Sequence, residues 1–284
     1  MNTENLLFLT DNLKFLGFGE GVHIKDQLEE YIFHETKEFQ LQMDSFYDDD
    51  YKMETTLYFR KADKADLYFF NKYEAVLRKA EAPERDRKQT FYISKGSGVT
   101  LKEAYNLLQG RAVNKNLIGV EGDRYNAWIQ LNFDEMTPSH NYRMKQFGER
   151  YGYDLEQVLK NYPIRELATD ESRAALLKAL KRGNLQPVHF VKPNKVEKMF
   201  IEANPQFKTI NIYTSTTNAL QKLFKEQDKV VKVVSPEKAE EPGKYEKPEN
   251  EEWTDDNSVA VEEGTEEGKE ATAGNPAPAK KRKS

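Results

Sequence analysis

The sequence predicts an α+β fold, in which antiparallel sheets carry helices packed on one face, followed by a disordered C-terminal tail. Two observations lead to this prediction. Segments with apolar residues at helical spacing alternate along the chain with segments in which every second residue is apolar. The last fifty residues are rich in charge and poor in branched aliphatic side chains, and such a segment cannot bury enough apolar surface to fold.

The length of 284 residues allows one or two domains. Changes in pattern and composition divide the chain into four regions. We expect N-terminal helices with an antiparallel sheet over 1–80, an α+β region over 88–215, a short helix or linker over 216–234, and an acidic tail with a basic end over 235–284.

The first region begins with two amphipathic helices and continues with strands. Residues 4–16 and 24–33 each place leucine or isoleucine on one helical face, and Gly17 is positioned to end the first helix. Alternating patterns then predict strands over 38–46, 51–61 and 67–77, and a fourth over 90–94, after a charged linker, at the start of the second region. In the third of these we expect the buried face to carry Leu67, Phe69, Tyr73 and Ala75.

After that strand, the second region contains a capping box. Thr100 is followed three residues later by Glu103, which predicts a helix from Leu101, and Gly110 is placed to end it. A strand over 125–133 should direct Ile129 inward. The remaining patterns predict helices over 155–161, 171–182 and 218–227, and strands over 187–191, 197–203 and 207–213.

Parts of this second region resemble each other. A shift of 73 residues places Gly110 on Gly183, and a shift of 72 places Ile129 on Ile201. The N-terminal region shows the same order of helix and strands without the glycine. Either a helix-plus-antiparallel-strand unit is repeated, or these are the matched apolar positions common in α+β domains.

Charge is distributed unevenly. The chain has 43 Lys+Arg and 48 Asp+Glu, of which 8 and 14 follow Ser235, so residues 1–234 hold 35 basic and 34 acidic residues and are nearly neutral. The absence of cysteine excludes disulfides and thiolate chemistry. No apolar run reaches the length of a membrane span, and the start lacks a basic signal region. We therefore expect a cytoplasmic protein that does not enter a membrane.

Catalytic signatures are missing from the sequence. The four histidines show no metal-ligand spacing, and the Asp48–Asp50 run lacks the further oxygens of a calcium loop. Neither glycine-rich stretch matches a phosphate loop or a dinucleotide fingerprint. We expect no metal and no cofactor, and an enzyme is the less favoured interpretation.

One glycine-rich stretch, formed by Lys95, Gly96, Ser97 and Gly98, leads into the helix that Thr100 begins. Free backbone N–H groups at a helix start can hold an anion. The competing interpretation is a simple turn between strand and helix, sealed by the Thr100 cap.

A more suggestive feature is a group of aromatic and basic residues assigned to strand faces opposite the aliphatic ones. Its members are Tyr58, Arg60, Tyr68, Phe70, Lys72, Tyr92 and Trp128. If these faces are open, they can stack unpaired bases. If helices cover them, the same aromatics belong to the core. The basic end, Lys280, Lys281, Arg282 and Lys283, is either a hook for nucleic acid or an acidic partner, or part of a solubilising tail.

Several segments resemble a family of uncharacterised Bacteroidetes proteins encoded with conjugative transposons and related mobile elements. They include KGSGVTLKEAYNLLQGRAVNK from Lys95 and KMFIEANPQFKTINIY from Lys198, and the similarity extends over about residues 5–213. The resemblance implies a bacterial cytoplasmic protein linked to DNA mobility, and it assigns no catalytic residue.

Together these features predict a non-enzymatic accessory or interaction protein of a mobile element that binds a protein partner or nucleic acid. One alternative is a single-stranded nucleic-acid-binding module that uses the aromatic sheet face. The other is an enzyme with an unrecognised site.

Overall fold

The computed structural model describes residues 2–19, 22–48, 51–79, 82–93, 98–119 and 122–214. It has five α-helices in these residues, which are α1 (Thr3–Phe15), α2 (Val22–Phe33), α3 (Leu101–Leu108), α4 (Leu155–Leu159) and α5 (Asp170–Lys181). The strands are β1 (Glu38–Asp48), β2 (Tyr51–Lys61), β3 (Tyr68–Lys79), β4 (Arg87–Tyr92), β5 (Val113–Ile118), β6 (Arg124–Met136), β7 (Tyr142–Gly148), β8 (Gln186–Lys192), β9 (Lys195–Asn204) and β10 (Thr209–Thr214). The helix expected over 218–227 and the expected disordered tail lie outside the described residues.

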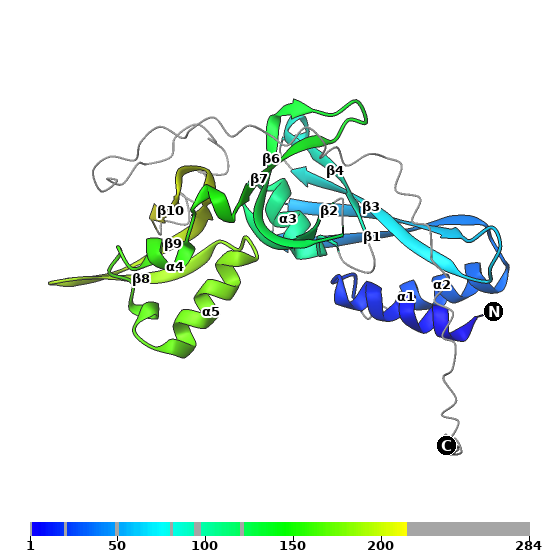
Figure 1. Cartoon of the computed structure of the whole chain (residues 1–284), viewed down its shortest axis with the longest axis horizontal. Helices are drawn as coiled ribbons and strands as arrows, with labels where there is room; N and C mark the ends of the chain where they lie inside the picture. Colours follow the sequence, from blue (N-terminus) through cyan, green and yellow to red (C-terminus); the bar gives the residue numbers. More distant parts are fainter. Residues whose placement is uncertain are drawn as a thin grey trace, which may run out of the picture. The chain divides into compact units, whose positions relative to one another are not determined.

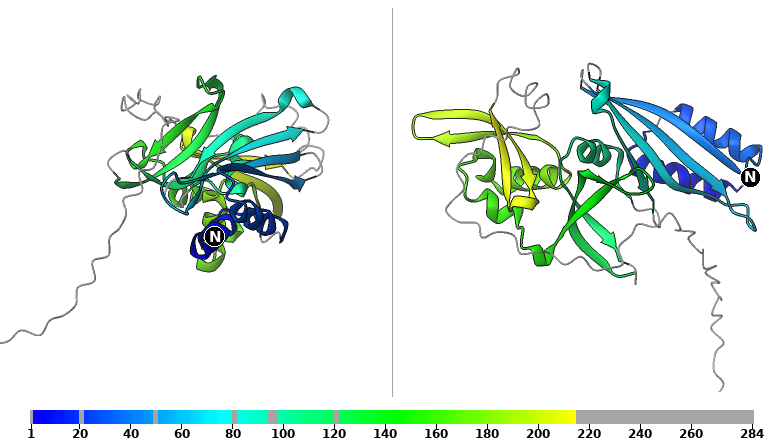
Figure 2. Two further views of the ribbon diagram at one scale, coloured as in Figure 1. Left: turned by 90° about the vertical axis from the view of Figure 1, so that its right-hand side faces the viewer. Right: turned by 90° about the horizontal axis from the view of Figure 1, so that it is seen from above.

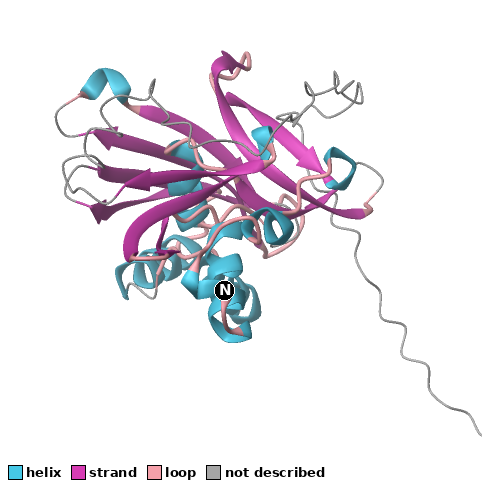
Figure 3. Ribbon diagram, turned by 90° about the vertical axis from the view of Figure 1, so that its left-hand side faces the viewer, coloured by secondary structure: helices cyan, strands magenta, loops and turns pink. Residues whose placement is uncertain are grey.

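The predicted α+β class is confirmed. All the strands pair antiparallel, in one four-stranded sheet of order β1-β2-β3-β4 and two three-stranded sheets of orders β5-β6-β7 and β10-β9-β8. The helices α1, α2 and α3 pack on one face of the four-stranded sheet (Figures 1 and 2). Figure 3 shows the longer helices gathered on one side of the strands. None of the described helices is both long and apolar enough to cross a bilayer.

The predicted orientation of the third strand is wrong over its first half. Tyr58 of β2 pairs with Lys72, but the next residue, Phe59, pairs with Phe70, so Asn71 is an extra residue in β3. Such a bulge moves the side chains that precede it to the other face. The side chains of Tyr68 and Phe70 therefore join Tyr73 and Ala75 in the core, whereas Phe69 does not.

Two hydrophobic cores meet at β6. The first core gathers residues from Leu6 to Leu131 between the four-stranded sheet and its helices. The second core lies around α4, α5 and the last sheet, and includes Leu180 and Ile201. Adjacent residues of a strand point to opposite faces, so Ile129 enters the first core and Trp128 enters the second.

The two three-stranded sheets have the same pairing. Val113 lies opposite Ile129 in the first and Gln186 lies opposite Ile201 in the second, so shifts of 73 and 72 residues superimpose all six β5–β6 pairs on β8–β9 pairs. The third strand follows with a constant shift of 66 residues, from Gln146 to Ile212. These shifts are those that relate the two segments in the sequence, and each sheet follows a helix.

Three helices that lead into a strand, α2 before β1, α3 before β5 and α5 before β8, are each followed by a residue with left-handed backbone conformation. Glu35, Gly110 and Gly183 have φ values of 53°, 88° and 77° and follow α2, α3 and α5. In each case the next residue donates its N–H to the carbonyl five positions earlier, at 3.1, 2.9 and 3.2 Å, which is the pattern of a Schellman cap. The first strand of each unit then begins three residues after the left-handed one.

Gly183 also lies where two units touch. Its Cα faces the Ala112 carbonyl and the side chains of Val113 and Asn106, and a Cβ there would lie 2.8 Å from the Ala112 oxygen. Gly152 has a similar φ of 76° but no atom within 4 Å of an added Cβ.

We predict that Gly183→Ala destabilises the protein far more than Gly152→Ala. Both changes force alanine into the left-handed region, at about 1–2 kcal/mol, but at Gly183 the clash with backbone adds about 1–3 kcal/mol. Urea unfolding followed by circular dichroism measures the difference. Equal losses of unfolding free energy would show that the contact of the two units at Gly183 tolerates a methyl group.

Candidate functional site

The face of the four-stranded sheet opposite the helices is open, because no described helix packs on it (Figures 1 and 2). Strand pairing aligns one residue from each strand in a row across this face, namely Gln40, Tyr58, Lys72 and Tyr92. All four side chains are half-buried or exposed. The adjacent row places Arg60 opposite Phe69. The face therefore presents aromatic rings beside cationic groups.

The centre of this surface is a contact between a lysine and a tyrosine. The Lys72 ammonium lies 5.3 Å from the centre of the Tyr58 ring, a distance at which the cation is attracted to the ring face. Burial, followed by the nearby Glu74 carboxylate, raises the pKa of the Tyr58 hydroxyl. The ring thus stays neutral and can stack on a planar ligand.

Most other cations on this face form ion pairs with nearby carboxylates of the protein. Lys88 pairs with Glu74 at 2.7 Å, and Arg78 bonds both Glu54 at 3.0 Å and Asp86 at 2.8 Å. The bond from Arg78 lowers the pKa of Glu54, so this carboxylate stays ionised. Lys72, in contrast, forms no ion pair within the described part of the chain. Among the described cations of this face, only Lys72 and the loosely paired, exposed Arg60 remain to attract an anion.

Three of the residues predicted for the aromatic surface are core residues instead. The exposed fractions of Tyr68, Phe70 and Trp128 are 1%, 6% and 5%. Tyr68 and Phe70 turn inward because of the bulge at Asn71, and Phe70 packs edge-on against Phe18. Trp128 points into the second core, on the far side of β6, where the centre of its ring lies 5.4 Å from that of Tyr153. The structure keeps Tyr58, Arg60, Lys72 and Tyr92 together on the open face.

The predicted anion loop is described only at Gly98, while Lys95, Gly96 and Ser97 lie outside the described residues. The Gly98 carbonyl accepts a hydrogen bond from Lys115 at 3.1 Å, and the same ammonium bonds Glu103 at 2.9 Å. The capping box is confirmed, with Glu103 accepting from the Thr100 N–H at 2.9 Å. A carboxylate therefore already lies at the start of α3. The basic end, Lys280–Lys283, also lies outside the described residues.

Groups of three or more possible metal ligands are absent among the described residues. His189 instead pairs with one carboxylate, since its Nδ1 lies 2.7 Å from Glu166 and its backbone N–H donates to the other oxygen at 3.0 Å. Burial raises the pKa of Glu166, but the two bonds from His189, a backbone hydrogen bond at Glu166 itself and the electrostatic attraction of His189 together lower it. The pair joins β8 to the segment before α5.

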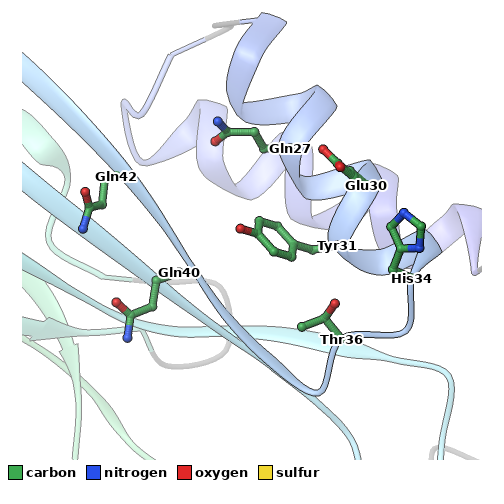
Figure 4. Close-up of a pocket in the computed structure, with 7 residues that line it drawn as sticks. All are labelled: Gln27, Glu30, Tyr31, His34, Thr36, Gln40 and Gln42. Carbon is green, nitrogen blue, oxygen red and sulfur yellow. The ribbon is translucent and has the colours of Figure 1, made fainter.

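Two further surface features were not predicted from the sequence. A hollow of about 570 Å³ lies between α2 and β1 (Figure 4), and its lining comprises Gln27, Glu30, Tyr31, His34, Thr36, Gln40 and Gln42. The outward side of α1 carries the exposed side chains of Leu7, Phe8 and Phe15. The sequence contained a signal for the second feature, because α1 is apolar on more than one side.

Comparisons of the chain with protein-family models, with curated proteins and with solved structures found no match.

We predict that the buried and open aromatics differ sharply when truncated. Trp128→Ala should lower the free energy of unfolding by about 3–5 kcal/mol, because it leaves a cavity in the second core. Tyr58→Ala should cost about 1 kcal/mol or less, as a cross-strand pair on an open face does. Chemical denaturation of both variants tests this; similar losses would mean that Tyr58 is also a core residue.

Proposed function

We propose that the protein is a non-enzymatic interaction protein that binds a protein partner through the outward side of α1. The observation that carries this proposal is the exposure of Phe8 and Phe15, at 60% and 72%. They are seven residues apart and therefore lie on one side of the helix, two turns from each other. Leu7 is also exposed, about 100° around the helix from Phe8.

The fold does not account for these side chains. The opposite side of α1 supplies Leu6, Leu9 and Leu13 to the first core, which is sufficient to hold an amphipathic helix on a sheet. Large apolar side chains clustered on an exposed surface are typical of protein–protein interfaces, where phenylalanine is enriched over the rest of the surface.

The resemblance to Bacteroidetes mobile-element proteins suggests which proteins to consider as partners. We extend the proposal accordingly to an accessory role in a mobile genetic element, in the bacterial cytoplasm, with a partner encoded by the same element. This part rests on the resemblance of residues 5–213, and the surface of α1 supports only the binding.

We predict that Phe8→Ser combined with Phe15→Ser abolishes binding to a co-encoded partner while the protein stays folded. Purified tagged protein and the purified products of neighbouring genes provide the test, with binding measured by calorimetry. Phe207→Ser is the matched control, because Phe207 is 66% exposed but lies far along the chain in the turn before β10. A partner bound equally by the double variant, or no partner among these products, would contradict the proposal.

A second candidate function is the binding of single-stranded nucleic acid on the open sheet face. The row that joins Tyr58, Lys72 and Tyr92, with Arg60 in the next row, favours it. Aromatic rings on a sheet can stack successive bases, at about 1–3 kcal/mol for each base. Since few cations remain unpaired, we expect stacking rather than charge to dominate the affinity, and a shallow dependence on salt.

We predict that Tyr58→Ala combined with Tyr92→Ala weakens binding to a labelled oligonucleotide by about tenfold or more, measured by fluorescence anisotropy at two salt concentrations. Phe207→Ala, which removes an exposed ring elsewhere, should leave the affinity unchanged. An affinity that survives the double change, or that disappears at the higher salt concentration for every variant, would exclude this face as a stacking site.

A further inference from the structure

The strand β1 is an open edge of the four-stranded sheet. It extends over eleven residues and, in the part of the chain that the structure describes, pairs with β2 alone. An edge strand of this length offers a row of backbone donors and acceptors to another extended chain.

The register shows which backbone groups are offered. The Lys61 N–H donates to the Lys37 carbonyl at 2.8 Å, so these two residues form a hydrogen-bonded pair. Along an antiparallel strand such pairs recur at every second residue. The odd-numbered residues of β1 therefore bond to β2, and Gln40 and Gln42 direct their N–H and C=O groups outward. Within the described residues nothing bonds to these groups.

The hollow beside this edge offers an added strand a second surface to contact, on α2. It lies between α2 and β1, and Tyr31 projects into the space between them (Figure 4). The Tyr31 ring stacks on Phe39 at 4.6 Å with 10° between the planes, so its position is fixed by the core. A chain that pairs with β1 would rest side chains against Tyr31 and beside Glu30.

Charge indicates what kind of chain fits. Residues 22–48, which form α2 and β1, contain seven Asp+Glu and two Lys, a net charge of 2 − 7 = −5. Lys52, Arg60 and Lys61 of β2 pair with three of these carboxylates, which leaves −5 + 3 = −2. The rest of residues 1–234 is therefore positive. A basic chain has the complementary charge.

We propose that β1 binds an extended, lysine- or arginine-rich segment of a partner protein as a fifth strand of the sheet. The outward groups of Gln40 and Gln42 form the backbone hydrogen bonds, while Tyr31 and Glu30 contact alternate side chains of the segment. Strand addition of this kind takes its affinity from main-chain bonds and its selectivity from alternate side chains. The site is separate from the outward side of α1.

The test uses the full chain and a nine-residue peptide of alternating lysine and threonine, with a glutamate-for-lysine peptide as control. When the basic peptide is added, we expect amide exchange at Gln40 and Gln42 of the protein, measured by NMR, to slow by about tenfold. The acidic peptide should bind at least about tenfold more weakly than the basic one. Unchanged exchange at both residues, or equal binding of the two peptides, would overturn the proposal.

Gln40→Pro and Gln40→Ala form a matched pair. Both remove the side chain, but only proline removes the outward N–H, and an edge strand tolerates proline at such a position. Gln40→Pro should weaken binding of the basic peptide by about tenfold, and Gln40→Ala should leave it almost unchanged. Equal affinities would contradict the proposed pairing, and so would a dimer of the wild-type chain that Gln40→Pro dissociates, since that result would assign the edge to a second copy.

Changing the peptide instead of the protein removes any dependence on folding. Two versions of the basic peptide are N-methylated, one at the odd and one at the even residues. Only one edge of an added strand faces β1, so one version should bind like the parent peptide and the other should not. If both versions bind equally, or neither binds, the segment does not pair with β1.

Discussion

The buried guanidinium of Arg111 joins the two halves of the described structure. It donates to the Gly183 carbonyl at 2.9 Å and to the Asn106 side-chain oxygen at 2.7 Å. Asn106 in turn donates to the Arg182 carbonyl and to Asn184, at 2.7 and 2.9 Å. A buried charge is tolerated only when its donors are satisfied, so the caps of α3 and α5 must keep this arrangement. The left-handed glycines that end both helices are part of the same junction.

This junction, together with β6, determines which surfaces are left for binding. The middle of β6 is buried on both sides, since Ile129 and Trp128 belong to different cores. The first sheet, in contrast, is covered by described helices on one face only, and its other face carries cross-strand ion pairs such as Lys88–Glu74. Three surfaces of different character remain: an apolar helix side, an aromatic sheet face with few unpaired cations, and an acidic sheet edge. Their chemistry is that of binding to extended or apolar partners.

Much of the architecture follows from local pattern. The capping box at Thr100, the glycine that ends α3 and the inward side of Ile129 are all confirmed, because caps and alternation depend on neighbours in the chain. The matched segments of the sequence are also matched in strand pairing, residue by residue. The strand β7 was not predicted, since the alternation of Tyr142 and Met144 with charged residues ends after four residues, at Gln146.

The candidate site was only partly accessible to sequence reasoning. The pattern determined that Tyr58, Arg60, Lys72 and Tyr92 share a face, because regular pairing preserves the period of two. Tertiary structure decided against Tyr68, Phe70 and Trp128: one bulge residue, Asn71, reversed the first two, and a second core on the far side of β6 covered the third. The open edge of β1 and the hollow beside α2 arise from how distant segments pack. Periodicity shows which side chains turn together, but it does not show which face or edge another element will cover.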